Sequence, residues 1–531
     1  MIATATDSTG SGFPSRLMTS EPTNRSARSS VAARPLKVRI SHASGMGYLN
    51  SVVIALDVGT SSARAAFYDG EGRPIAGRSH QVKYTPRLTP DGGVEHDAER
   101  LLEAVVACLD AIHPNRPPEE TRGVGVATFW HGLLGFDSGG HPITPVYTWA
   151  DTRSFTEAQV LRSALDDDAV HARTGCHLHS SYWPAKLRWF VREYPTQASR
   201  VARWGSFGEF LELSLFGEAS TSVSMASGTG LVDQATARWD VEAMAAAEVD
   251  EHHLFPLCDR HEPRHGLRAP WANRWPALRT ATWFPAVGDG AASNVGSDCI
   301  DPTRIALNVG TSAALRVVAR DQPTPPRGLW RYRIDRKHAI LGGATSEGGN
   351  IYAWCRRVLQ LGSDEEIERA LATLAPDGHG LTILPHLAGE RAPGWRDGRQ
   401  GMIAGLRLDT SAIEIARAAL ESVALRLATV YDLLAPCASA GHTIVASGAA
   451  MGHSRVWTQM ITDAIGHPIT WSVEPEATSR GAAVLALEAL GVLPGLSSAR
   501  RPTGETFVPN DAHHIRYREA LERQRRLDER V

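Results

Sequence analysis

The stretch Asp57-Val58-Gly59-Thr60-Ser61-Ser62 follows an apolar run, and nearly the same pattern returns in the second half of the chain as Asn308-Val309-Gly310-Thr311-Ser312. Apolar residues resume after each copy, so both copies predict a β-hairpin with small hydroxyl side chains at its tip. Gly59 and Gly310 permit a backbone conformation that exposes successive N–H groups, and such turns bind anions. Two copies predict two similar domains that each present an anion-binding turn to a shared ligand, for which a nucleotide triphosphate is the natural candidate.

Length and composition agree with two globular domains. A chain of 531 residues is too long for one core, and a hydrophobic content of 43% is sufficient to fill two. The formal net charge of −3 argues against nucleic acid or an anionic membrane as the main partner. Six scattered cysteines without metal-binding spacing predict free thiols, and no apolar stretch approaches the roughly 18 residues of a membrane span. We therefore expect a cytoplasmic protein.

The first 50 residues differ from the rest of the chain. They are rich in Ser, Thr, Ala and Arg and show no hydrophobic periodicity, which predicts a disordered leader. An organelle transit peptide and an upstream start codon, with translation beginning near Met46, are the two alternatives. We assign no chemistry to this segment.

From Val52 onward the pattern predicts an α/β fold with mixed sheets and flanking helices. In the first half the predicted strands are 52–57, 63–68, 74–80 and 123–129, and the predicted helix is 97–112. In the second half the predicted strands are 304–309, 312–318, 383–384 and 443–446, and the predicted helices are 413–434 and 455–465. We place the domains at 51–298 and 299–492, followed by a charged tail, 493–531, whose last 21 residues predict an exposed helix.

Four segments, taken in order, carry a resemblance to a known family. Asp57–Arg64 resembles the first phosphate hairpin of the FGGY carbohydrate kinases, which are relatives of actin and the heat-shock chaperone ATPases. Val287–Ala292 resembles the segment that holds the catalytic aspartate of that family, and Asn308–Ser312 resembles its second phosphate hairpin. Ala446–Trp457 resembles its adenosine site, which Glu476–Ala483 continues. The resemblance covers roughly residues 52–490.

The resemblance implies two ribonuclease H-like (actin-like ATPase) domains, with mixed sheets flanked by helices and a cleft between them. It implies ATP-dependent phosphorylation of a sugar hydroxyl with Mg²⁺, with ATP on the C-terminal side and the sugar on the N-terminal side. The residues that it places against the nucleotide are Gly59, Thr60, Ser61, Ser62, Arg64, Gly310, Thr311, Ser312, Gly448, Ala449 and Ser454. This chain has Ala449 and Ala450 where the family is richer in glycine, which leaves the adenine contacts open.

Two aspartates fit the chemistry of phosphoryl transfer, which needs a divalent cation and a base aimed at the acceptor hydroxyl. Asp57 ends a predicted strand just before its turn, where its carboxylate would face the phosphates. Repulsion between these like charges makes this position unfavourable unless a cation lies between them. We therefore predict that Asp57 binds Mg²⁺ through water; the alternative is that it only caps its turn. Asp289 lies between Gly288 and Gly290, which permit close approach of a substrate, and we predict that it is the catalytic base. A plain turn is the alternative.

The acceptor site is predicted from polar side chains interleaved with aromatic ones, which suit a polyol. The candidate substrate contacts, besides Asp289, are Trp130, His131, Trp149, Asp151, Arg153 and Lys186. Structural roles for the histidine and the tryptophans are the alternative. Residues 129–131, 149–153, 222–230 and 389–395 resemble the gluconate kinase branch more than the glycerol kinases.

The acceptor that this resemblance favours is gluconate, whose carboxylate would pair with Arg153 or Lys186. A pentulose such as xylulose or ribulose is the alternative. Two other classes of function are open: a non-catalytic nucleotide-gated module and a catalytically silent sugar-binding regulator. Asp57, Asp289 and both hairpins favour the kinase over these classes. For assembly, a homodimer is the default expectation.

Overall fold

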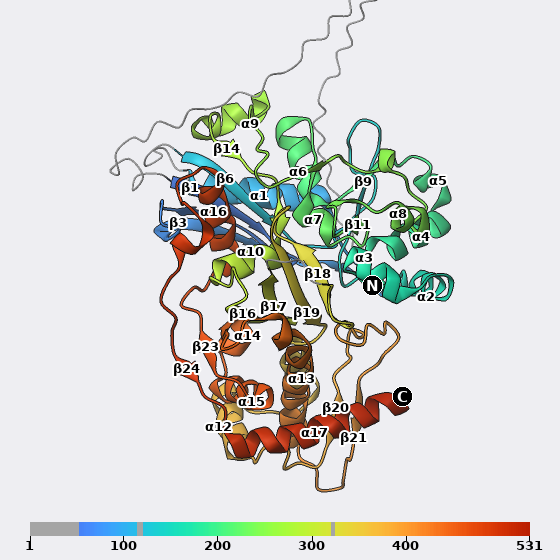
Figure 1. Cartoon of the computed structure of the whole chain (residues 1–531), viewed down its shortest axis with the longest axis vertical. Coiled ribbons are helices and arrows are strands. Elements are labelled where there is room, and N and C mark those ends of the chain that lie inside the picture. The colour runs from blue at the N-terminus through green and yellow to red at the C-terminus, as the bar shows by residue number, and fades with distance from the viewer. Residues whose placement is uncertain (1–51, 114–120, 320–323) are drawn as a thin grey trace, which may run out of the picture. The chain divides into compact units, whose positions relative to one another are not determined.

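The computed structural model describes residues 52–113, 121–319 and 324–531, and these belong to one compact unit. The predicted leader, residues 1–50, lies outside the described residues. Two mixed β-sheets, with helices packed against them, organise the described chain (Figure 1).

The first sheet has the strand order β14-β6-β1-β2-β3, and β15 also pairs with β6. Strands β1 and β2 form the first predicted hairpin, and β1 runs parallel to β6. The strands are β1 (Val52–Val58), β2 (Ser62–Tyr68), β3 (Pro74–Lys83), β6 (Thr121–Thr128), β14 (Thr282–Trp283) and β15 (Val287–Gly288).

The second sheet has the strand order β18-β19-β17-β16-β22-β23-β24. Strands β16 and β17 form the second predicted hairpin, and β16 runs parallel to β22. The strands are β16 (Arg304–Val309), β17 (Ala313–Ala319), β18 (Trp330–Arg333), β19 (Ala339–Thr345), β22 (Thr443–Ser447), β23 (Ile469–Trp471) and β24 (Thr506–Phe507).

The centres of the two sheets have the same topology. The order β3-β2-β1-β6 in the first sheet corresponds to β19-β17-β16-β22 in the second, with the same antiparallel and parallel pairings. The prediction of two related domains with mixed sheets and flanking helices is therefore confirmed.

The helices flank these sheets or build the insertions between strands. They are α1 (Ala98–Ile112), α2 (Phe155–Ala164), α3 (Asp167–Thr174), α4 (Trp183–Glu193), α5 (Pro195–Ala198), α6 (Phe207–Phe216), α7 (Val223–Ser227), α8 (Val241–Ala246), α9 (Ala269–Arg274), α10 (Asp289–Gly296), α11 (Gly349–Val358), α12 (Asp364–Thr373), α13 (Ala412–Leu434), α14 (Ala449–Gly452), α15 (Arg455–Ile465), α16 (Ala477–Ala489) and α17 (Asp511–Arg530).

Short strands pair outside the two large sheets. They are β4 (Arg87–Leu88), β5 (Val94–His96), β7 (Leu134–Phe136), β8 (Val146–Tyr147), β9 (Arg203–Gly205), β10 (Thr221–Ser222), β11 (Val232–Asp233), β12 (Arg238–Trp239), β13 (Leu257–Cys258), β20 (Thr382–Leu384) and β21 (Met402–Ala404).

Helix α1 shows why the predicted elements form where they do. The side chain of Asp97 accepts hydrogen bonds from the backbone N–H groups of Glu99 and Arg100, so the helix begins with a satisfied cap. Its buried face includes Leu101, Leu109 and their helical neighbours, which pack toward β2 and β3. The helix ends at Ile112, as predicted.

Helices α10 and α16 cross at unusually close range and connect the two halves of the chain. A Cβ added at Gly296 would lie 1.7 Å from the Ala477 carbonyl oxygen, and one added at Gly481 would lie 1.8 Å from that of Ala292. Only glycine permits this approach. Helix α16 follows the second sheet in sequence but packs against β1 and β6 of the first, so residues of the second half support the strands that carry Asp57.

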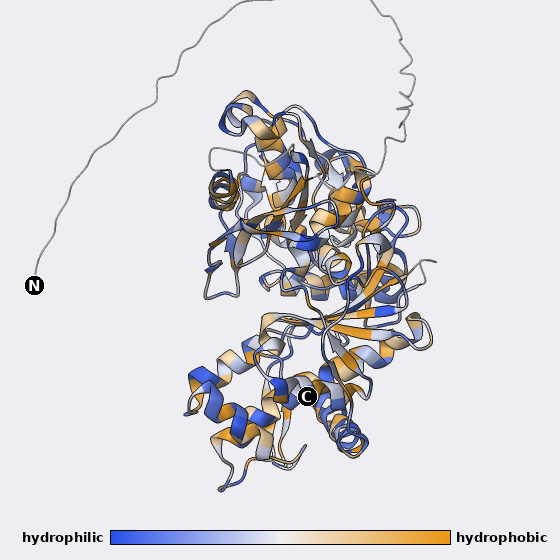
Figure 2. Cartoon of the chain, turned by 90° about the vertical axis from the view of Figure 1, so that its left-hand side faces the viewer, coloured by the Kyte–Doolittle hydropathy of each residue, from blue (hydrophilic) through white to orange (hydrophobic). Residues whose placement is uncertain are grey.

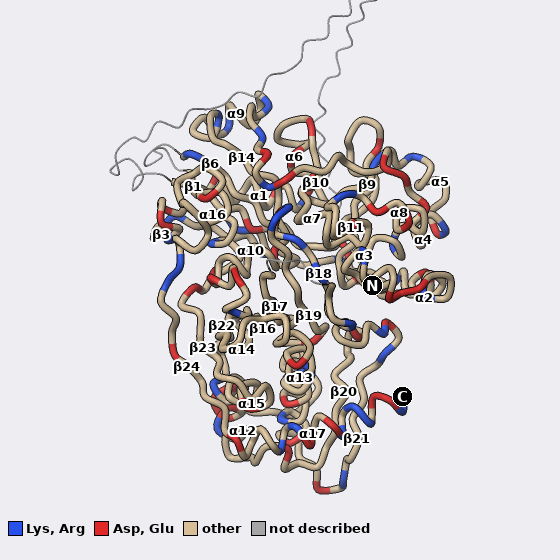
Figure 3. The backbone as a smooth tube through the Cα atoms, in the orientation of Figure 1, with Lys and Arg blue, Asp and Glu red and all other residues tan. Residues whose placement is uncertain are grey.

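Helix α17 corrects one expectation. It is helical and charged as predicted, with both signs along its length (Figure 3), but the expectation that it is exposed was wrong. Tyr517, Leu521 and Gln524 are buried, and the Tyr517 hydroxyl donates to Glu421 Oε1 at 3.0 Å. The apolar stripe is narrow, and the many charges around it conceal it in the sequence.

The interior is apolar and its thiols are free. The strands and their flanking helices carry much of the hydrophobic colouring in Figure 2. All six cysteines are free, and five of them are buried, which confirms the expectation of unpaired thiols. In the described ranges, no helix combines the length and the apolar character needed to cross a membrane.

Candidate active site

The candidate site forms where parallel strands of the first sheet end. Strands β1 and β15 both run parallel to β6 and pair with it on opposite edges. Ala127 of β6 is opposite Asp57 on one edge and opposite Val287 on the other. The polar segments that follow these strands therefore gather at one edge, the usual ligand position in such sheets. This edge brings together Asp57, the pair Trp130–His131, and Asp289.

Asp57 and Asp289 interact electrostatically. Burial, together with the carboxylates of Asp289 and Glu476, raises the pKa of Asp57 to about 7, against the opposing charge of Arg64. Burial also raises the pKa of Asp289, against the nearby charge of Arg316 and a hydrogen bond of 2.8 Å from its neighbour's backbone N–H. Two partly buried carboxyl groups that repel each other form a site suited to a cation or a proton.

Trp130 fixes the backbone around Asp289. A Cβ at Gly288 would lie 1.9 Å from its indole ring, and a Cβ at Gly290 would lie 2.5 Å from it, so the ring covers the glycines on both sides of the aspartate. The indole Nε1–H donates to the Ser224 carbonyl at 2.9 Å. Trp130 is 5% exposed. The structure therefore gives this predicted substrate contact a supporting position beside Asp289.

The two hairpin turns are each closed by a backbone hydrogen bond from the glycine. Gly59 N–H donates to the Ser62 carbonyl at 2.9 Å, and Gly310 N–H donates to the Ser312 carbonyl at 3.0 Å. Neither glycine has a positive φ, and the exposure of successive N–H groups to an anion stays a prediction. The glycines leave the first position of each turn without a side chain. Ser61, at the tip of the first turn, is exposed.

Other backbone segments pack against the second hairpin. Gly448 has φ +107°, and a Cβ there would lie 2.4 Å from the Val309 carbonyl oxygen, which places the predicted adenosine segment directly beside the hairpin. Gly349 N–H, at the start of α11, donates to the Gly310 carbonyl at 2.7 Å. Nothing in the sequence pointed to Gly349, because a lone Gly-Gly pair predicts only a turn.

The remaining predicted nucleotide contacts divide into exposed and engaged positions. Thr311 and Ala449 are exposed, and Thr60 and Ser312 are partly exposed. Arg64 pairs with Glu476 at 2.8 Å. The Ser454 hydroxyl caps α15, accepting from the Trp457 N–H at 2.9 Å and donating to a Glu368 carboxylate oxygen at 2.7 Å.

His131 is buried and neutral. Burial lowers its pKa to about 3. Its Nδ1 lies 2.6 Å from the Gly228 carbonyl oxygen, which can only accept, so Nδ1 carries the proton and Nε2 is an acceptor. The rings of Tyr182 and Tyr332 lie edge-on to it, and the two tyrosine hydroxyls are 2.6 Å apart. An aromatic enclosure drawn from both halves of the chain thus surrounds an imidazole acceptor.

Arg153 and Asp151 are engaged with each other. Arg153 pairs with Asp151 at 2.5 Å and with Glu95 at 2.7 Å, and its guanidinium lies 4.7 Å from the Trp189 ring centroid. Asp151 also accepts from the Val94 N–H at 3.1 Å. These contacts satisfy the charge of Arg153 within the first half of the chain.

Lys186 lies in the same region without an ion pair among the described residues. Its ammonium donates to the Ser180 carbonyl at 2.5 Å, and burial lowers its pKa to about 7, while Asp151 and Asp397 oppose that shift.

A loop of the second half packs against the predicted acceptor residues of the first half. Asp397 accepts from the Ser180 N–H at 3.0 Å and lies 3.1 Å from His179 Nε2, which docks the loop on the first half. The same loop places the guanidinium of Arg391 4.7 Å from the ring centroid of Trp149. The sequence reasoning missed Arg391 and Arg316, because no local pattern tells which arginine faces a site and which faces solvent.

Two actin-like domains, with paired aspartates at a strand edge between two phosphate-type hairpins, define a carbohydrate kinase. The family model for the N-terminal domain of the FGGY carbohydrate kinases matches residues 52–296, and the model for the C-terminal domain matches residues 305–490. The chain belongs to the FGGY family of carbohydrate kinases.

Individual relatives agree with this assignment. A gluconokinase of Bacillus subtilis is 28% identical over 472 residues, covering 86% of this chain and 91% of the relative. The crystal structure of a gluconate kinase from Lactobacillus acidophilus has a TM-score of 0.82 at 24% identity, covering 90% of this chain and 97% of that one. A ligand-bound xylulose kinase from the same organism has the same TM-score, identity and coverage.

Proposed function

We propose that this kinase transfers the γ-phosphoryl group of ATP to a hydroxyl of gluconate, with Asp289 as the general base. The observation that carries the proposal is the position of Asp289 at the end of β15, where it faces Asp57 and the nearby Arg316. The gluconokinase of Bacillus subtilis, which this chain resembles over most of its length, supports the choice of acceptor.

Asp289 is suited to accept a proton. Its raised pKa makes its carboxylate a stronger base than an exposed aspartate. The glycines on both sides carry no side chain, and the Trp130 ring covers them, with Arg316 Nε beside Gly290. In this proposal the carboxylate orients the acceptor hydroxyl and takes its proton as the phosphoryl group arrives.

The donor set at Asp57 fits a magnesium ion. Mg²⁺ prefers carboxylate oxygens and water, and the Asp57 carboxyl is destabilised by burial and by Asp289 and Glu476. A bound cation would offset this repulsion and the charge of the triphosphate. We propose that Asp57 holds the cation, through water, and that Asp289 remains available to the acceptor.

The sugar side would use the acceptor and donor groups already described. His131 Nε2 is placed to accept a hydrogen bond from a sugar hydroxyl, and Trp149 supplies an aromatic face. Lys186 and Arg153 remain proposed contributors on this side; the charge of Arg153 is already paired, whereas the ammonium of Lys186 is not.

The nucleotide would lie along the two turns and the segment at Gly448. Backbone N–H groups and hydroxyls at Thr60, Ser61, Thr311 and Ser312 suit phosphate oxygens. The close packing of Gly448 on the second hairpin puts Ala449 beside the same turn, which supports an adenosine position there.

A coupled ADP-release assay over gluconate, xylulose, ribulose and glycerol tests the proposal. We expect strong turnover of gluconate and little of the others. Xylulose is the second candidate, since a xylulose kinase shares the fold equally well, and preferential turnover of xylulose or ribulose would replace gluconate in the proposal. Light scattering of the same preparation tests the expected homodimer.

A further inference from the structure

Two arginines of the second half lie in the site without an ion-pair partner among the described residues. Within residues 52–113, 121–319 and 324–531, neither Arg316 nor Arg391 forms an ion pair. Nε and Nη1 of Arg316 and Nε of Arg391 are buried and lack a hydrogen-bond partner. Arg391 is 8% exposed. Asp289 attracts Arg316 from beyond ion-pair distance and Arg391 repels it, so the two guanidinium groups outweigh the one carboxylate. Burying excess positive charge is unfavourable, which indicates that an anion belongs beside the two arginines.

Arg316 lies next to Asp289, and Arg391 acts on the same aspartate electrostatically. A Cβ at Gly290 would lie 3.1 Å from Arg316 Nε, which places this side chain next to the proposed base. After burial, Arg316 and then Arg391 are the charged side chains that act on the pKa of Asp289, and the two arginines repel each other. On β17, Arg316 is opposite Ala306 and Gly342, and the Trp330 ring covers Gly342, where a Cβ would lie 2.8 Å from it.

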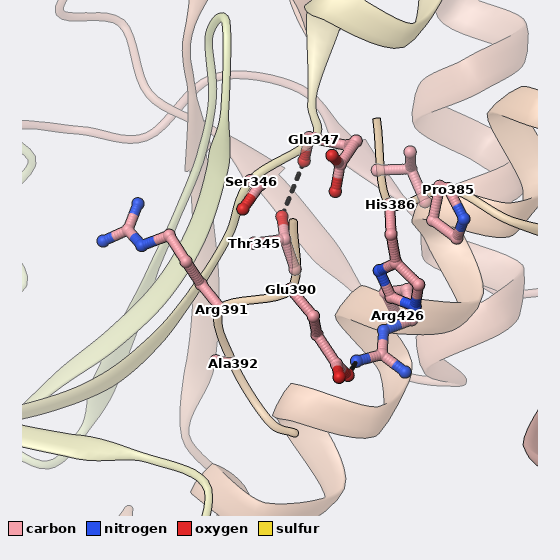
Figure 4. A pocket seen from close by; sticks show the side chains of 10 residues that line it. Thr345, Ser346, Glu347, Pro385, His386, Glu390, Arg391, Ala392 and Arg426 are labelled. Atoms are coloured by element: carbon pink, nitrogen blue, oxygen red, sulfur yellow. Dashed lines mark hydrogen bonds and ion pairs between the residues drawn. The ribbon is translucent and has the colours of Figure 1, made fainter. Parts of the chain in front are cut away.

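Arg391 extends from this point toward the sugar side. Its guanidinium stacks on Trp149, and its charge contributes to the lowered pKa values of His131, His179 and Lys186, for which burial is the main cause. Figure 4 shows it pointing away from the Glu390–Arg426 ion pair that its neighbour forms. The loop thus separates a satisfied pair on one side from an unpaired guanidinium on the other.

We propose that Arg316 and Arg391 together bind the carboxylate of the acceptor and make this kinase selective for sugar acids. The inference rests on the proposed function and deepens it. A carboxylate matches the planar donor fork of guanidinium, and two arginines can share its two oxygens. The surroundings of Arg391 are Trp149, His131, His179 and Lys186 rather than the hairpin turns, which favours the acceptor over the triphosphate as the anion.

The proposal explains why Arg153 is a poor candidate for the same task. Its charge is already compensated by Asp151 and Glu95 at 2.5 and 2.7 Å. A substrate carboxylate there would approach two fixed carboxylates. At Arg316 and Arg391 the same carboxylate would instead relieve repulsion between two cations.

The test compares gluconate with gluconamide, which has the same hydroxyls but no charge. Turnover of both is measured for the wild type and for Arg316→Met, Arg391→Met and Arg391→Lys. In the wild type, kcat/KM is higher for gluconate. We expect each Met variant to lose roughly 10- to 100-fold in kcat/KM on gluconate, mainly through KM, as for loss of a charged hydrogen bond. In Arg391→Met the turnover of gluconamide and the KM for ATP change little, and Arg391→Lys retains part of the preference. In Arg316→Met the pH profile of gluconamide turnover also shifts upward, because Arg316 lowers the pKa of Asp289.

Gluconamide turnover also reports correct folding of each variant. Arg188→Met is the matched control: Arg188 lies on α4 near Lys186 but pairs with Glu248 at 2.6 Å, so the preference for gluconate should persist.

The failures are distinguishable. A wild type that prefers gluconate, with variants that keep that preference, overturns this inference and leaves the proposed function intact. Equal losses on both substrates assign the arginines to the phosphoryl group and also overturn it. A wild type without turnover of gluconate overturns the proposed function itself.

Discussion

The two hairpins share one scaffold but differ in the charge of the residue before the turn. In the first, Asp57 ends β1 and faces Asp289, and its neighbours raise its pKa. In the second, Asn308 holds the equivalent position in β16, and its side-chain amide donates to the Ser447 hydroxyl at 3.1 Å. The strand after the second turn carries Arg316, whose charge acts on Asp289.

In the proposed function, this difference divides the tasks of phosphoryl transfer between the two halves. A cation and a proton acceptor need negative charge, which the first half supplies, whereas triphosphate and substrate anions need neutral donors and positive charge, which the second supplies. The duplicated scaffold differs in one residue at the strand end and in the use of the arginine beyond the turn: Arg64 pairs with Glu476, whereas Arg316 lies beside Gly290. The predictions below test this division, from the largest expected effect to the smallest.

Removing the charge of Asp289 should have the largest effect. Asp289→Asn keeps the size of the side chain but cannot accept the proton, so we expect kcat to fall by about 10²- to 10⁴-fold. Calorimetry should show nearly unchanged binding of ATP and gluconate, because the hairpins and the sugar side remain. Turnover close to that of the wild type would remove Asp289 from the proposed role of base.

Converting the first strand end into a copy of the second tests the metal assignment. Asp57→Asn reproduces the Asn308 side chain on β1, and we expect kcat/KM to fall roughly 10- to 100-fold with a higher requirement for Mg²⁺. Titration of activity with Mg²⁺ measures this change.

The control for this variant is Asp137→Asn, since Asp137 caps a turn away from the strand edge and accepts from its own loop. An unchanged Mg²⁺ requirement in Asp57→Asn would reduce Asp57 to a turn cap.

Much of this arrangement could be predicted from the sequence, because repeated local patterns determine it. The two Gly-Thr-Ser turns and their apolar flanks predicted the hairpins, and Asp97 with its apolar stripe predicted α1. Arg316 and Arg391 could not be predicted, because their role depends on which distant groups surround them. Helix α17 was misjudged for a related reason: its few buried residues contact segments far away in sequence.

The close crossing of helices α10 and α16, which connects the two halves, can be tested by measuring stability. Gly481 on α16 lies against the Ala292 carbonyl of α10, and Gly481→Ala puts a methyl group where there is no space. We expect a loss of about 1–3 kcal/mol in the free energy of unfolding, measured by denaturant titration.

Gly495→Ala is the matched control, because nothing lies within 4 Å of a Cβ there and its backbone is extended. Equal stability of the two variants would mean that the α10–α16 crossing relaxes easily.

The reverse substitution, Asn308→Asp on β16, should have the smallest effect. It is the sharpest test of the proposed division of roles between the two hairpins. Asn308→Asp places a carboxylate where the proposal puts triphosphate oxygens, and it replaces the amide donor to Ser447 with an acceptor. At a partly exposed position, repulsion of a phosphate corresponds to about 1 kcal/mol or slightly more, so we expect the KM for ATP to rise about 10-fold. The KM for gluconate should stay within experimental error, because the sugar side is built from other residues. If the variant instead bound ATP normally and lost affinity for gluconate, the second hairpin would face the acceptor, and the two halves would have exchanged the roles that their charges indicate.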